Sequence, residues 1–219
     1  MKTPPYFQHP VVFEILAAGT TLIRIHRDHL GPFWYGNGVP EWRFDSPNGK
    51  FGTMYAGLDH TASIVETVLK GPPGQIITRD TLYTRAWTEL RLTRSIRVAA
   101  LWGAGLTKNG VSSGLVHHDD YDVTMQIANE VFEAAPDAHG IQYTSTRNDT
   151  HRNVAIFDRA GPDFFEIVQT VRFEDWPKNN WLPIIEEHGA IFGGSSAVPG
   201  EIEEEDAEAD IGTPPADAS

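Results

Sequence analysis

The order of strand-like and helix-like segments constrains this chain most, because strand-like segments are numerous and few of them alternate with helices. Apolar residues that alternate with polar ones, or that form short runs between turns, indicate strands. Two helices are clear: one that Asp59 can cap and that ends near Gly71, and one that begins after Asp119 or Asp120. This order predicts a mixed α+β domain rather than a doubly wound sheet. The expected strands lie at residues 20–28, 51–56, 85–103 (two strands joined by a turn), 140–145, 153–158 and 163–174, and the expected loops at residues 31–50 and 146–152.

The length and composition indicate a single domain with its own core. The chain has 219 residues, of which 40% are hydrophobic. It contains no cysteine, which excludes disulfides, thiolate zinc sites and a cysteine nucleophile. The N-terminus lacks the architecture of a signal peptide, and no apolar run approaches the roughly 20 residues that span a bilayer. The sequence therefore predicts a soluble, cytoplasmic protein without a membrane partner.

The charge is concentrated at the C-terminus. The net charge is −13, which argues against direct binding of nucleic acid. Residues 194–219 hold eight acids and no Lys or Arg, so removing them leaves −5 for the rest. Such a composition predicts a disordered acidic tail after a folded domain at residues 1–193. The tail is either a solubilising segment or a docking segment for a basic partner.

Glu66 is unusual because it lies among apolar residues of the first expected helix. At about 100° per residue, Glu66 is about 40° from Ala62 on the helical wheel, with Val65 and Leu69 flanking the same side. A carboxylate at the edge of a buried stripe needs hydrogen bonds, a cation or water. Glu66 is therefore either a rim residue whose head reaches solvent or a functional acid in a cleft.

Four other polar residues are candidates of the same kind. Arg24 projects from a strand beside apolar residues, and a guanidinium in such a place often binds a carboxylate or a phosphate. Tyr55 lies near the end of a strand and precedes the helix that carries Glu66. Ser145 ends a strand at a polar loop, and Arg147 follows two residues later. Taken singly, each of these residues has a structural explanation: an ion pair for Arg24, core packing for Tyr55 and a turn for Ser145. No single position decides the function.

Together these residues resemble the RES domain family, which is named for an Arg, a Glu and a Ser in this order. Arg24 stands in "LIRIHR", Tyr55 in "GKFGTMYAGLDHTASIVE", Glu66 eleven residues later in the same stretch, and Ser145 in "GIQYTSTRNDTHRNVAIFD". The order and the local contexts agree over residues 22–158. One departure is that residues 31–50 lack the common G-G-R-W-N form of the family, for which "PEWRFDSPNGK" is the counterpart here.

The resemblance implies a fold like that of ADP-ribosyltransferases, with a split mixed sheet around an NAD cleft. Members of the family act as toxins of toxin–antitoxin pairs and deplete NAD⁺, and their usual partners are Xre-like antitoxins. NAD⁺ would thus be a substrate, with no cofactor and no metal, and the acceptor would be water or inorganic phosphate. The sequence leaves the acceptor and a homo-oligomeric state open.

The resemblance also implies a role for each residue. Glu66 would stabilise the positive charge that develops on the ribose as nicotinamide leaves. Arg24 would clamp the pyrophosphate, and Arg147 would add a phosphate contact. Tyr55 would pack on the nicotinamide or the ribose, and Ser145 would hydrogen-bond the ribose or the amide.

Three other functions compete with NAD⁺ cleavage. Transfer of ADP-ribose to a protein often uses an E-x-E pair, which occurs here only in the acidic tail. Serine hydrolysis would use Ser112 or Ser113 with residues 117–120, but no G-x-S-x-G elbow is present. The "HHDD" at residues 117–120 offers metal-ligand types, but adjacent residues on a forming helix do not converge well, so a capped helix start is the preferred interpretation. A non-catalytic NAD-binding or interaction module is the third alternative.

Overall fold

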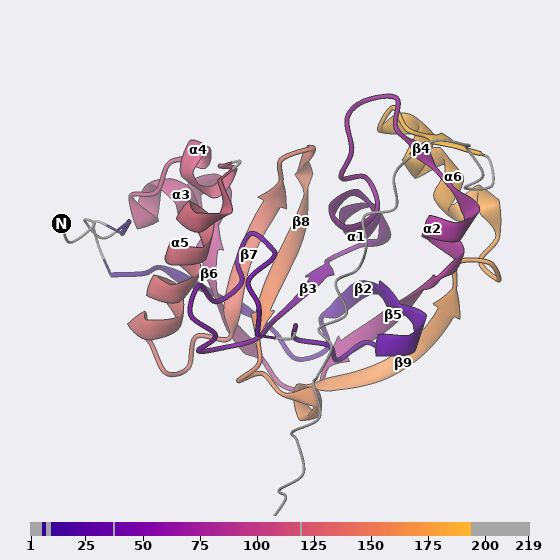
Figure 1. Ribbon diagram of the computed structural model, residues 1–219. Helices are drawn as coiled ribbons and strands as arrows, with labels where there is room; N and C mark the ends of the chain where they lie inside the picture. The colour runs from indigo at the N-terminus through magenta and orange to yellow at the C-terminus, as the bar shows by residue number, and fades with distance from the viewer. Residues whose placement is uncertain (1–5, 8–9, 37, 119, 194–219) are drawn as a thin grey trace, which may run out of the picture.

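The computed structural model describes residues 6–7, 10–36, 38–118 and 120–193. Within them the chain forms ten strands and six α-helices (Figure 1). The strands are β1 (Phe13–Leu16), β2 (Thr21–Arg27), β3 (Thr53–Gly57), β4 (Ile76–Ile77), β5 (Arg85–Leu92), β6 (Ile96–Leu101), β7 (Gly140–Ser145), β8 (Asn148–Phe157), β9 (Phe165–Arg172) and β10 (Ile191–Phe192). The helices are α1 (His60–Thr67), α2 (Arg79–Tyr83), α3 (Gly103–Asn109), α4 (Ser113–Val116), α5 (Tyr121–Ala134) and α6 (Lys178–Glu187).

Eight of the strands form one mixed sheet in the order β1-β6-β7-β8-β3-β2-β5-β9. Neighbours in this sheet run antiparallel except for β6 and β7, which are parallel. The short strands β4 and β10 pair separately, in parallel. The expected α+β class with a mixed sheet and flanking helices is confirmed.

The sheet is divided between β2 and β3. These strands are in register at one Cα pair only, Ile23 with Gly57, whereas β2 pairs with β5 over its whole length. The strands diverge beyond that pair, so backbone groups on their facing edges lack the usual ladder partners. Arg24, the next residue of β2, lies at this division.

Helices cover the two halves of the sheet in separate groups. Figure 1 shows α3, α4 and α5 beside β6 and β7, and α1, α2 and α6 towards β2, β5 and β9. One apolar cluster joins α5 to β7 and β8 through residues such as Ile127, Ile141 and Phe157. A second joins α1 and α6 to β2 through residues such as Val65 and Ile23. Each of these two clusters belongs to one half of the sheet, while a third, which includes Leu22 and Val154, spans strands of both halves.

Helix α1 is held tightly over the division by one serine. The Ser63 Oγ donates to the Ile23 carbonyl at 2.6 Å and accepts the Gly57 N–H at 3.0 Å. Gly57 leaves room for this contact, because a Cβ on it would lie 2.5 Å from the Ser63 Oγ. Ser63 thus links α1 to both strands at their single point of register.

Several expected elements are confirmed and some are corrected. Asp59 caps α1 as expected, but the helix ends at Thr67 rather than near Gly71, because the Val68 and Leu69 N–H groups both bond to the Ile64 carbonyl. Residues 146–152 are not a polar loop, since β8 begins at Asn148 and pairs back onto β7. Residues 31–50 contain no strand or helix in their described part, as expected.

The structure also contains elements that the sequence analysis did not predict. Helices α3 and α6 are the longest of them, with seven and ten residues, and α6 is interrupted by Pro183. Such segments carry little periodicity to detect. The acidic tail at residues 194–219 lies outside the described residues.

Candidate functional site

A cavity of about 570 Å³ opens at the division of the sheet. Its walls come from the edge of β2, from β3, from the end of α1, from the β7–β8 turn and from the loop at residues 31–50. This volume is typical of a small-molecule site. The five candidate residues from the sequence all line it: Arg24, Tyr55, Glu66, Ser145 and Arg147.

The Arg24 guanidinium fills the gap between the diverging strands. Its terminal nitrogens donate to the Tyr55 carbonyl at 2.6 Å and to the Trp34 carbonyl at 3.0 Å. Its Nε is buried without a hydrogen-bond partner among the described residues. Burial lowers the pKa of Arg24 to about 10, so the group stays charged at neutral pH. In this structure Arg24 positions β3 and the loop, and its terminal nitrogens are occupied.

Tyr55 is fixed from the loop side. Its hydroxyl donates to the Asp45 carboxylate at 2.9 Å and accepts the Phe44 N–H at 2.9 Å. Burial raises the pKa of Tyr55 well above its usual value, and the negative charge of Asp45 adds to this. The ring is therefore held in one orientation at the cavity wall as a neutral phenol.

Glu66 faces the cavity from α1 and is only half-buried. Its carboxylate accepts a hydrogen bond from the Tyr143 hydroxyl at 3.1 Å. Burial, followed by the charge of Glu66, raises the pKa of Tyr143 well above its usual value, so the phenol remains a donor. One carboxylate oxygen of Glu66 is thus anchored while the residue lines the cavity. This favours a functional acid over a residue whose carboxylate only reaches solvent.

Ser145 and Arg147 belong to the turn between β7 and β8. The Ser145 side chain is buried, and its Oγ accepts the Arg147 N–H at 3.3 Å. The Arg147 guanidinium donates to the Gly71 carbonyl at 2.6 Å and to the Lys70 carbonyl. Arg147 therefore ties this turn to the chain that follows α1.

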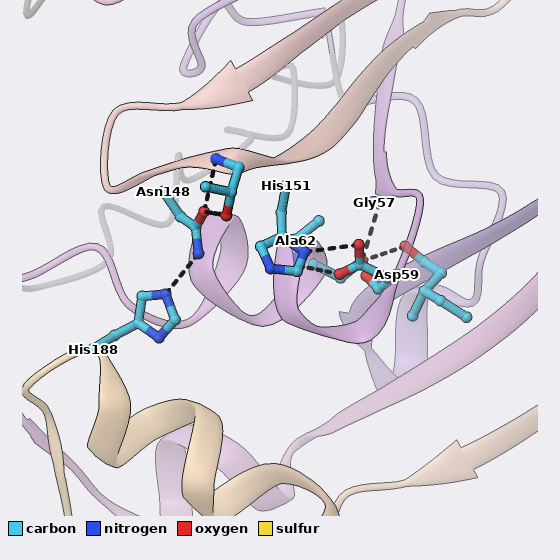
Figure 2. Close-up of polar contacts among 9 residues, drawn as sticks. Gly57, Asp59, Ala62, Asn148, His151 and His188 are labelled. Atoms are coloured by element: carbon cyan, nitrogen blue, oxygen red, sulfur yellow. Dashed lines mark hydrogen bonds and ion pairs between the residues drawn. The ribbon is translucent and has the colours of Figure 1, made fainter.

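Polar contacts around α1 hold the surrounding elements in place (Figure 2). Asp59 accepts the Ala62 N–H at 2.8 Å, and its second oxygen lies 2.8 Å from the His151 Nδ1. The Asn148 amide nitrogen lies 2.9 Å from the His188 Nε2, which joins the β7–β8 turn to the end of α6. These contacts therefore fix two elements that carry site residues, α1 and the β7–β8 hairpin.

Sequence reasoning missed Tyr143, which holds Glu66 but does not line the cavity, and several residues that do line it. Tyr143 could have been found, because it lies two residues before Ser145 and hence on the same face of β7. Lys70 had no sequence signal, and its contact with Trp42 forms only in three dimensions, with the Lys70 Nζ 3.2 Å from the centroid of the Trp42 ring. Arg27 and Arg85 also line the cavity.

The cavity is positively charged although the chain is acidic. Six Arg or Lys residues and three Asp or Glu residues line it. The cations are Arg24, Arg27, Arg43, Lys70, Arg85 and Arg147, and the acids are Glu41, Asp45 and Glu66. An excess of positive charge in a walled site favours an anionic ligand.

The residues behind the competing functions are placed elsewhere. Ser112 accepts the Leu115 N–H as the cap of α4, and the His117 Nε2 lies 3.1 Å from the Thr144 carbonyl rather than near a serine hydroxyl. Asp120 caps α5, which confirms the interpretation of this stretch as a capped helix start. No group of three or more His, Asp or Glu side chains suited to a metal occurs among the described residues.

Residues 21–179 match the RES domain family, a span that holds every candidate residue. The chain belongs to the RES domain family. Its fold resembles a chain in the crystal structure of the M. tuberculosis MbcT–MbcA toxin–antitoxin complex, with a TM-score of 0.54 at 14% identity, covering 78% of this chain and 91% of that one. No curated protein matches the sequence.

The span that matches the RES domain contains the whole site. The matched span ends within α6 and includes the whole cavity wall. In the described part of this RES protein, no helix is both long and apolar enough to cross a membrane.

Proposed function

We propose that this RES protein is the toxin of a toxin–antitoxin pair and that it degrades NAD⁺ by cleaving the bond between nicotinamide and ribose. The observation that carries the proposal is the Glu66 carboxylate, which is held by Tyr143 at the wall of a positively charged cavity. Membership of the RES family and the fold shared with a chain of the MbcT–MbcA complex support the toxin assignment.

The chemistry needs a carboxylate near the reacting ribose. Loss of nicotinamide from NAD⁺ builds positive charge on the ribose in an oxocarbenium-like transition state. A fixed carboxylate stabilises that charge more than it stabilises the ground state, which lowers the barrier. Tyr143 would keep the Glu66 carboxylate oriented, and the second carboxylate oxygen is left for the ribose.

The other residues would shape the pocket for the nucleotide. Tyr55, held by Asp45, offers an oriented ring to the nicotinamide or the ribose. Arg24 would act mainly by positioning β3 and the loop, since its terminal nitrogens bind backbone carbonyls. Ser145 would contribute its hydroxyl from the turn. The acceptor is water or inorganic phosphate, and the proposal includes no metal and no further cofactor.

An Xre-like antitoxin is the proposed partner. The exposed aromatic residues Trp34 and Trp42 lie at the cavity and offer an apolar contact surface beside it. We place the activity in the cytoplasm, where NAD⁺ is available, and propose no nucleic-acid or membrane partner.

The test is to incubate the purified protein with NAD⁺, with and without phosphate, and to determine product masses. Nicotinamide with ADP-ribose would identify a glycohydrolase. Nicotinamide with a phosphorylated ADP-ribose, formed only when phosphate is present, would identify a phosphorylase. Persistence of intact NAD⁺ with a folded protein would refute cleavage, and ADP-ribose attached to protein would indicate a transferase instead.

A second experiment addresses the toxin assignment in cells. Induced expression of the chain should stop growth while the NAD⁺ pool falls, and co-expression of its antitoxin should restore both. Growth arrest with an unchanged NAD⁺ pool would contradict the proposed mechanism of toxicity.

A further inference from the structure

Three of the six cations at the cavity already use their guanidinium groups on backbone carbonyls. Arg24, Arg43 and Arg147 each donate from terminal nitrogens to carbonyl oxygens of neighbouring segments. Their charge contributes to the field in the cavity, but each already commits at least one terminal nitrogen to the protein. A ligand's phosphate oxygens would therefore find freer donors on the other cations.

The remaining cations are Arg27, Lys70 and Arg85. None of them forms an ion pair with a carboxylate in the part of the chain that the structure describes. Arg85 donates through Nε to the Thr81 carbonyl at 3.2 Å, and its terminal nitrogens make no backbone hydrogen bond to a described residue. These are the three cations of the cavity whose terminal nitrogens make no hydrogen bond to a described residue.

The three cations also approach one another, which costs energy unless an anion intervenes. Arg27 and Arg85 are directly opposite in the β2–β5 ladder, an arrangement that destabilises like charges. Burial and then the charge of Arg27 lower the pKa of Arg85. Desolvation lowers the pKa of Lys70 to about 8, and the charge of Arg85 contributes in the same direction.

The nearby acids do not neutralise this cluster. Glu66 acts on the charge of Lys70 more strongly than Arg85 does, and Asp45 and Glu41 act less strongly, but none of these acids forms an ion pair with Lys70 among the described residues. Asp28, which follows Arg27, lies 3.3 Å from the Arg172 Nε and pairs with that residue instead. The cluster therefore stays positive beside the cavity.

We propose that Arg27, Lys70 and Arg85 form a subsite for a phosphate group, and that the diphosphate bridge of the nucleotide occupies it. This assignment rests on the proposed function and deepens it. Lys70 lines the cavity with Glu66 and interacts electrostatically with both Glu66 and Arg85, so a ribose at Glu66 places the adjoining phosphates towards Lys70 and the paired arginines. Guanidinium forks and an ammonium are the side-chain groups that suit phosphate oxygens.

Equilibrium binding tests the subsite separately from catalysis. Calorimetry on Glu66→Gln protein, which should not turn over NAD⁺, would compare ADP-ribose with adenosine, which lacks phosphate. Arg27→Gln and Arg85→Gln should each weaken ADP-ribose binding about tenfold or more and leave adenosine binding unchanged. The matched control is Arg91→Gln, an exposed arginine on the same strand β5 that pairs with Glu166 and lies outside the cavity lining. It should change neither affinity.

Kinetics on protein that retains Glu66 would distinguish the two sources of phosphate. If the diphosphate bridge occupies the subsite, Arg27→Gln raises the KM for NAD⁺ and leaves the dependence on inorganic phosphate unchanged. If free phosphate occupies it, the half-saturating phosphate concentration rises instead, which keeps the phosphate subsite but overturns the assignment to the diphosphate bridge.

The outcomes separate the subsite from the proposed function. NAD⁺ cleavage with unaltered KM and phosphate dependence in the Arg27→Gln/Arg85→Gln protein would overturn the subsite while the function stands. Phosphate-dependent ADP-ribose binding without any cleavage would keep the subsite and overturn the function. Equal loss of ADP-ribose and adenosine binding would show a structural effect and overturn the subsite.

Discussion

Glu66 and Tyr143 form the pair of side chains from which the rest of the site can be understood. Tyr143 is fully buried, and its ring packs edge-on against Phe44 with centroids 4.7 Å apart. Because its raised pKa keeps the phenol protonated, its hydroxyl can only serve the carboxylate as a donor. This contact explains how a helix tolerates an acid on its buried side.

Removing the Tyr143 hydroxyl should reduce catalysis without unfolding the protein. Tyr143→Phe keeps the buried ring but loses the hydrogen bond that orients Glu66, and a bond to a charged group is worth about 1.5 kcal/mol or more. We expect kcat for NAD⁺ loss to fall about tenfold, measured by nicotinamide release. Tyr83→Phe, on α2 outside the cavity lining, is the control. An unchanged kcat would contradict the positioning role of Tyr143.

Lys70 should give ligand binding a dependence on alkaline pH. Its pKa of about 8 lies below the usual 10.5, so raising the pH through 8 converts the free protein's ammonium to the neutral amine. ADP-ribose affinity of the Glu66→Gln protein should therefore fall by up to about tenfold between pH 7 and pH 9. Lys70→Arg should bind equally at both pH values, because an arginine stays charged. The same fall in the Lys70→Arg protein would exclude Lys70 as its cause.

Residue types in the sequence predicted well which residues line the cavity. They did not predict which groups those side chains contact. Arg24, Glu66 and Ser145 are recognisable because they interrupt apolar patterns or end a strand, and all three line one cavity. The partners of Arg24 are backbone carbonyls, which no sequence pattern reveals. The contact of Lys70 with Trp42 depends on how residues 31–50 fold over the sheet, and that loop has no periodicity.

At the scale of elements, the site depends on how α1 is attached to two diverging strands. Ser63 bridges the helix to both strands, and Ile23 with Gly57 is their one pair in register. Buried backbone groups at such a point need a partner because no ladder supplies one. The serine therefore fixes the position of the helix that carries Glu66.

Truncating this serine should destabilise the fold more than a surface serine does. Ser63→Ala leaves a buried carbonyl and a buried N–H unsatisfied, and we expect a loss of about 2 kcal/mol in the free energy of unfolding. Urea denaturation measures it, with the exposed Ser113→Ala on α4 as the control. Equal stability of the two variants would show that the Ser63 bridge contributes little.

Elements were predictable where their pattern is long and uniform. The strand that became β2 and the capped helix α5 have clear periodicity and were expected. The polar first half of β8 was expected to be a loop, because its side chains are exposed and only pairing with β7 makes it a strand. Pairing with β7 determines that this segment is a strand, and the local sequence pattern does not reveal that pairing.

At the scale of the molecule, an acidic chain surrounds a basic cavity. The net charge is −13, yet cations outnumber acids two to one in the cavity lining. A field of this kind attracts an anionic nucleotide into the cavity. One apolar cluster packs in each half of the sheet and a third spans both, and the cavity lies at the division, where walls from both halves meet.

The most direct test is the rate of nicotinamide release from NAD⁺ by the unaltered protein and by Glu66→Gln. The matched control is Glu187→Gln, an exposed acid at the end of α6. We predict rapid release by the unaltered protein and by the control, and a loss of at least about a hundredfold in Glu66→Gln, since the amide cannot stabilise the positive charge. Full activity of folded Glu66→Gln protein would contradict the account.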